Sequence, residues 1–168
     1  MAELCLVRHH SARLMNEPPF ARHAWLIFIA VTVANALILK FHSRAHVQRQ
    51  PELAAGYRRL FNGVLFWGNL PWLAMGLSIV FGGVDSFFSY FRPRDGNPLV
   101  LAWFGLVIVL WLLGFYWLFA RRGAEFLVEH PGLLRGNPQS PAMIRFFYCL
   151  IVAGGIAGLC FIFFAEHS

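Results

Sequence analysis

The sequence predicts an all-α, polytopic membrane protein in which four transmembrane helices form a bundle. Four apolar stretches without charged residues run through the chain, and each approaches the length that a helix needs to cross about 30 Å of hydrocarbon. Lipid offers the backbone no hydrogen-bond partners, so each stretch must be helical. Hydrophobic residues make up 58% of the 168 residues and charged residues only 13%. A typical soluble domain carries about 25% charged residues.

We expect a single integral membrane domain over 1–168, with a polar arm at 1–23 and spans at about 24–41, 64–84, 99–120 and 143–165. Basic residues precede the first stretch and small residues occur at Ala34 and Ala36, a pattern also found in secretory signal peptides. Because Leu37, Ile38 and Leu39 continue the apolar run, we expect this stretch to be a retained spanning helix.

The flanks of the second and third spans predict helix beyond the bilayer. Pro51 followed by Glu52 is typical of a helix start, and apolar residues recur at helical spacing from Leu53 to Val64. After the third span we expect the helix to continue through 125–129 and to stop before Pro131. Between the second and third spans, four rings in five residues predict a short segment in the membrane interface: Phe87, Phe88, Tyr90 and Phe91.

The two halves of the chain have similar landmarks. Ala24 and Trp25 precede Ala102 and Trp103 by 78 residues, and Pro51 precedes Pro131 by 80 residues. Each half contains two spans, so the halves are either two repeated helical hairpins or two hairpins that share an order of apolar, basic and proline segments by coincidence.

Small residues form helix-packing faces on two of the predicted helices. The fourth span carries two overlapping small-xxx-small pairs, and the second span carries one row; such faces let helices approach closely in lipid. We expect the two faces to pack on each other or to make contacts between subunits. Their members are Ala153, Gly154, Ala157 and Gly158 in the fourth span and Ala74, Ser78 and Gly82 in the second.

Few polar residues lie within the spans. Asn35, Asn69 and Ser78 either form hydrogen bonds between helices or line a weakly polar pore. His42 and His46 share one helix face, and Glu125, Glu129 and His130 lie near the matching end of the third span. These residues are a weak candidate for a metal site, and a solvated interfacial face is the favoured interpretation. Cys5, Cys149 and Cys160 have no disulfide or metal spacing, and we expect no cofactor.

No catalytic motif stands out, so we expect a non-enzymatic subunit of a homo- or hetero-oligomeric membrane complex. The alternative is a small oligomeric channel or transporter with a weakly polar pore, and the third hypothesis is a membrane enzyme acting on lipid or quinone. The expected partners are the bilayer, its anionic headgroups, and other membrane subunits or further copies of this chain. The net charge of +6 lies beside the apolar stretches, so we do not expect nucleic acid as a partner.

The positive-inside rule predicts the orientation. Nine of the fourteen Lys and Arg residues lie in the first and third connections or at their edges, with Lys40 and Arg145 counted as edge residues. This distribution places these connections in the cytoplasm and both termini outside. We expect the membrane to be the bacterial inner membrane.

A labelling experiment tests this orientation. In a chain whose three native cysteines are replaced by Ser, an impermeant thiol reagent added outside is expected to label Ser168→Cys but not Gln50→Cys. The opposite labelling pattern would reverse the assignment, and labelling after the membrane is permeabilised checks that both positions react.

Overall fold

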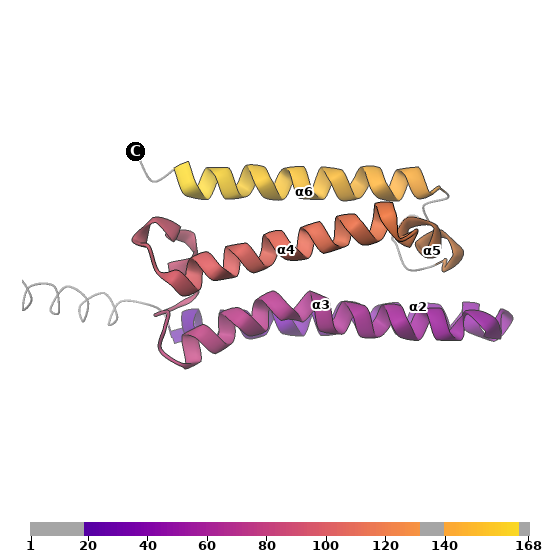
Figure 1. Cartoon of the computed structure of the whole chain (residues 1–168). Helices are drawn as coiled ribbons and strands as arrows, with labels where there is room; N and C mark the ends of the chain where they lie inside the picture. The colour runs from indigo at the N-terminus through magenta and orange to yellow at the C-terminus, as the bar shows by residue number, and fades with distance from the viewer. Residues whose placement is uncertain (1–18, 132–139, 165–168) are drawn as a thin grey trace, which may run out of the picture.

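The structure, a computed structural model, describes residues 19–131 and 140–164, and its secondary structure there is helical (Figure 1). Residues 1–18 of the predicted polar arm, loop residues 132–139 and the end of the fourth span at 165 lie outside the described residues. The helices are η1 Pro19–Arg22, α2 Ala24–Arg49, η2 Pro51–Leu53, α3 Ala54–Val80, η3 Phe87–Phe91, η4 Pro93–Asp95, α4 Pro98–Ala120, α5 Gly123–Glu129 and α6 Pro141–Phe164.

Four helical segments are long and apolar enough to span a membrane: α2, the combined η2–α3 segment Pro51–Val80, α4 and α6. They pack in contact, which confirms the predicted all-α fold with four transmembrane helices. The protein is therefore an integral membrane protein with four spans.

Most helix ends agree with the sequence-based expectations, and two differ. The second helical segment begins at Pro51, as predicted, and the four-ring segment at 87–91 forms a short helix. The prediction that the second span reaches 84 is wrong. Its helix stops at Val80 because Gly82 has φ 73° and the N–H groups of Gly83 and Val84 both donate to the Ser78 carbonyl. Gly82 therefore lies in the turn and not on the packing face of α3.

The third span does not continue into α5 as one helix. Arg122 adopts a left-handed conformation with φ 56°, and this residue separates α4 from α5. The next residue, Gly123, lies so close to Trp117 that an added Cβ would be 2.5 Å from the indole ring. The turn between the helices thus requires a residue without a side chain, which places α5 against the end of α4.

α2 and α3 pack antiparallel along their length. The Phe28 and Trp72 rings stack with centroids 4.2 Å apart, and the Lys40 ammonium lies 5.2 Å from the centroid of Phe61. At other points along this helix contact, glycines of α3 face side chains of α2. A Cβ on Gly76 would be 2.5 Å from Trp25, so Gly76 lets this ring lie directly on the α3 backbone.

α4 and α6 form a second antiparallel hairpin that uses larger side chains. Phe104 and Phe163 make an edge contact at one end, with centroids 5.6 Å apart. Near the middle, Trp111 lies against Gly155, where an added Cβ would be 2.5 Å from the indole ring. The Tyr148 hydroxyl donates to the Trp111 carbonyl. Trp111 therefore packs inside this hairpin, between α4 and α6.

The main core lies at the end of the bundle that contains η1, η3 and η4, called the loop end below. Its buried residues come from α3, α4 and the connection between them: Met75, Ile79, Val84, Tyr90, Val100 and Phe104. Trp25 of α2 and Phe163 of α6 pack against this cluster. The Trp103 indole N–H donates to the Pro71 carbonyl at 2.8 Å and so ties α4 to α3. Toward α5, α4 diverges from α3 (Figure 1).

The structure thus contains the two hairpins that the sequence predicted, α2 with α3 and α4 with α6. Their connections differ, because Pro51 begins a helix directly after α2 whereas Pro131 follows the separate helix α5. The internal duplication stays a prediction.

Gly155→Leu tests the packing of α6 on α4. We expect it to destabilise the folded protein by about 1–3 kcal/mol, because the new side chain would overlap Trp111. The control is Gly105→Leu on α4, where nothing lies within 4 Å of an added Cβ. Denaturant unfolding in detergent micelles measures the difference, and equal stabilities of the two variants would contradict the proposed close contact.

Candidate functional site

The predicted small residues of α6 lie on its outer side. Ala153, Gly154, Ala157 and Gly158 are all exposed, and no described atom lies within 4 Å of a Cβ added to either glycine. These four residues are called the small-residue face. Gly155, which sequence reasoning did not single out, is the glycine that faces α4. Gly155 is distinguished by its contact with the large side chain of Trp111. Only the packing of the two helices reveals this contact.

The predicted small residues of α3 lie elsewhere. The Ser78 hydroxyl donates to the Met75 carbonyl at 2.7 Å and makes a hydrogen bond with the Tyr90 hydroxyl. Ala74 is half-buried, and Gly82 lies in the turn after α3. The two sets of small residues therefore do not meet within the described chain, which corrects the first of the two packing alternatives. Contact of the α6 face with another subunit stays a prediction.

The polar residues of the spans are not brought to one surface. Asn69 is only 7% exposed, and its Nδ2 donates to the Leu65 carbonyl at 2.8 Å. Asn69 Oδ1 is buried and has no hydrogen-bond partner among the described atoms. Asn35 is exposed on α2, and Ser78 bonds within the loop end. The contacts of Asn69 and Ser78 are those of local packing and not of a shared polar path.

The weak metal candidate is not assembled among the described residues. No group of three or more His, Cys, Asp or Glu side chains there has a geometry that holds a metal ion. His42 and Glu129 are exposed, His46 is half-buried, and His130 is buried. Proximity to the same end of the bundle does not make these side chains converge. The favoured interpretation, a solvated interfacial face, is wrong for His130, whose side chain is only 4% exposed. His130 instead has a packing role.

His130 and the residue after it attach the end of α5 to the start of α3. The His130 ring lies against Gly56, and it meets the Tyr57 ring edge-on with centroids 5.0 Å apart. Its Nδ1 is 2.7 Å from the Phe126 carbonyl. The Tyr57 hydroxyl donates to the Pro131 carbonyl at 2.7 Å. Gly56, Tyr57, His130 and Pro131 form the α5 joint, which bridges the two hairpins where α4 and α3 have diverged.

Arg145 of α6 connects this helix to α4 and α5 at the same end. Its Nη2 donates to Glu125 Oε1 of α5 at 2.7 Å, and its Nε donates to the Leu118 carbonyl of α4 at 3.3 Å. The guanidinium also lies 5.7 Å from the centroid of Phe119. Hydrogen bonding from its own backbone N–H, and then from Arg145, lowers the pKa of the Glu125 carboxyl group. From the sequence, Arg145 entered only the count of basic residues that predicts the orientation, and this contact role was not predicted.

Comparison with known proteins gives no family for this chain. No family model, no curated protein and no solved structure matched it. The proposals below therefore rest on the chain's own residues and contacts.

The ion pair between Glu125 and Arg145 predicts a pH-dependent stability. Because folding lowers the pKa of Glu125, the pair stabilises the folded protein above the ordinary carboxyl pKa, and this contribution disappears as the pH falls through the lowered value. Glu125→Gln is expected to lower the thermal unfolding temperature at neutral pH and to match the parent in acid. Glu52→Gln, an exposed change at the same end, serves as the control. A Glu125→Gln difference that is the same at all pH values would contradict this role.

Proposed function

We propose that the protein is a membrane subunit whose role is assembly, and that copies of the chain associate through the small-residue face of α6. The observation that carries the proposal is the position of Gly154 and Gly158, which face away from the rest of the described chain. We retain the predicted orientation, in which the end that carries α5 faces the cytoplasm.

The position of α6 at the margin of the bundle supports this proposal. α6 contacts α4, α5 and η4. Its most apolar 18-residue stretch contains no residue that is buried within the described chain. Its inner side uses Tyr148 and Gly155 against α4, so the small-residue face is free for a second helix. In Figure 1, α6 forms one edge of the molecule.

The shape of the outer side of α6 also favours a helix as the partner. Lipid tails are as apolar as the side chains, so helices associate in a bilayer through close van der Waals packing. Large exposed side chains lie on both sides of the small-residue face along the helix, with Phe146 64% and Phe161 72% exposed. A row of small residues between bulky ones lets two helix backbones approach closely while the flanking rings pack beside them.

A second copy of the same chain satisfies the geometry simply. Two copies in one membrane share an orientation, and a two-fold axis along the membrane normal would bring the same face of both α6 helices together. Residues at equal depth would then meet. Cys160 is exposed on α6 and lies two residues beyond the small-residue face, so it reports on such an arrangement.

Leucine substitutions on α6 test the proposal. Gly154→Leu and Gly158→Leu are expected to shift the purified protein from dimers or larger oligomers to monomers, as measured by native mass spectrometry. The backbones could no longer approach closely. Unlike Gly155→Leu, these variants should keep the stability of the parent, because nothing in the described chain lies near the new side chains.

Gly105→Leu is the matched control, because it makes the same change at another open glycine, one flanked by Leu101 and Val109 at helical spacing. In a chain whose only cysteine is Cys160, mild oxidation in membranes should give a disulfide-linked dimer. A chain with Leu112→Cys on α4 as its only cysteine should not. A parent protein that is monomeric in both measurements, or leucine variants that assemble normally, would overturn the proposal.

A further inference from the structure

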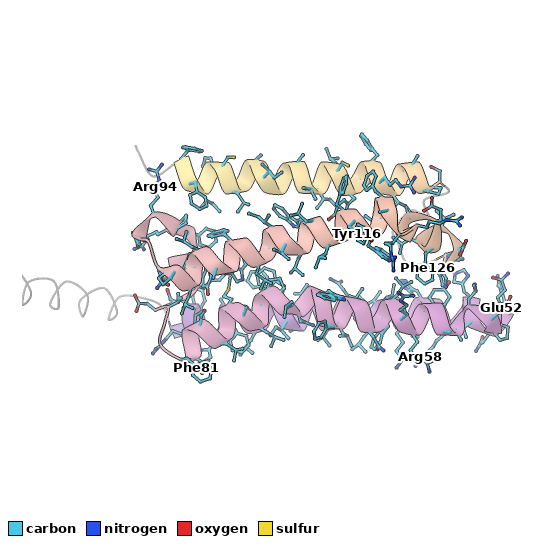
Figure 2. All side chains as sticks on the ribbon, in the orientation of Figure 1. Glu52, Arg58, Phe81, Arg94, Tyr116 and Phe126 are labelled. Atoms are coloured by element: carbon cyan, nitrogen blue, oxygen red, sulfur yellow. The ribbon has the colours of Figure 1, made fainter. Side chains whose placement is uncertain are left out.

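A cavity of about 540 Å³ lies between α2 and α3, at the same end of the bundle as α5. Figure 2 places Arg58 and Glu52 toward this end and Phe81 and Arg94 at the opposite one. The cavity is called the basic groove. Its lining residues are Leu39, Lys40, Ser43, Arg44, Val47 and Gln48 of α2 and Ala54, Tyr57, Arg58, Phe61 and Asn62 of α3.

The charge of the basic groove is entirely positive. Lys40, Arg44 and Arg58 line it, and none of its lining residues is acidic. Within the described chain these three cations make no ion pair with a carboxylate. Lys40 and Arg44 instead lie over aromatic rings, at 5.2 Å from the Phe61 centroid and 5.8 Å from the Phe41 centroid. Three cations without a carboxylate around one cavity create a strong local attraction for an anion.

The basic groove lies where the helices leave the hydrocarbon. The uncharged run of α2 ends at Leu39, directly before Lys40, and that of α3 begins at Leu60, directly after Arg58 and Arg59. The contact between Lys40 and Phe61 shows that these boundaries are at the same level on both helices. Lipid phosphates occupy this level in a bilayer.

The remaining lining residues indicate which anion fits. Leu39, Val47 and Phe61 give the groove apolar walls beside its cations. An inorganic anion would leave these walls exposed, whereas a lipid places its glycerol and upper acyl carbons against them. Arginine binds phosphate oxygens in a bidentate manner, and lysine contributes a point charge. A zwitterionic headgroup would bring a further cation toward three cations that are already present, so a headgroup with a net negative charge is favoured.

We propose that the basic groove binds an anionic glycerophospholipid, with its phosphate held by Lys40, Arg44 and Arg58 and its acyl chains lying along α2 and α3. This site lies on the opposite hairpin from the α6 face, so it does not depend on the proposed assembly. The phosphate chemistry is shared with free phosphate, and the apolar walls are what favour the lipid.

Native mass spectrometry of the purified full-length protein tests this proposal. Phosphatidylglycerol and phosphatidylcholine with identical acyl chains are added separately, and we expect phosphatidylglycerol to bind about tenfold more tightly at one site. The triple variant Lys40→Gln/Arg44→Gln/Arg58→Gln should weaken its binding by about fivefold for each cation removed, or on the order of 100-fold in total. Excess inorganic phosphate should not displace the lipid.

A matched control makes the same change in charge outside the groove. Arg59→Gln/Arg121→Gln/Arg122→Gln removes three exposed arginines that do not line the cavity, and it should keep the parent's affinity for phosphatidylglycerol. Equal binding of the two lipids by the parent protein would overturn the proposal without any variant. Equal losses of phosphatidylglycerol affinity in the two triple variants would also overturn it. Complete displacement of the lipid by inorganic phosphate would assign the site to the free ion and would overturn the proposal as well.

Discussion

The constraint on which this structure depends is that the bilayer offers the backbone no hydrogen-bond partners. Each of the four apolar segments must therefore be a complete helix, and, among the residues that the structure describes, irregular chain is confined to the two ends of the bundle. At those ends, specific groups satisfy the helix termini. Asn97 accepts from the N–H groups of Leu99 and Val100 at the start of α4, while its Nδ2 donates to the Gly83 carbonyl beyond α3. One side chain thus joins the end of one span to the start of the next.

Within the bilayer, contact between helices depends on rings placed over glycines. Trp25 lies on Gly76, Trp111 lies on Gly155, and Tyr148 lies beside Gly114. Burial of apolar surface contributes little where the solvent is itself apolar, so the closeness of each contact decides its stability. Glycines already covered by a ring hold this chain together. Gly154 and Gly158 of α6 have no such cover and lie beside the small exposed residues Ala153 and Ala157, which is why we place assembly there.

The end with α5 is organised differently from the loop end. At the loop end an apolar core joins all four spans, whereas near α5 the two hairpins are joined through the α5 joint, and the Arg145 contacts hold α4, α5 and α6 together. These polar contacts suit a position in the headgroup region, where water and lipid charges are present. The basic groove lies at the same end of the bundle, on α2 and α3. Both hairpins thus present polar chemistry at one membrane surface, and the proposed lipid would add to it.

The sequence by itself determined the four spans, their approximate limits and the helix start at Pro51, because length, hydropathy and proline position are local properties. Only the tertiary structure decided which side of each helix faces inward. The sequence singled out Gly154 rather than Gly155 and favoured a solvated position for His130. Gly155 packs on Trp111 and His130 packs on Tyr57, and both partners are distant along the chain. The left-handed turn at Arg122 and the groove between α2 and α3 were hidden for the same reason. In a uniformly apolar helix the hydrophobic pattern does not mark the buried face, so contacts between helices decide it.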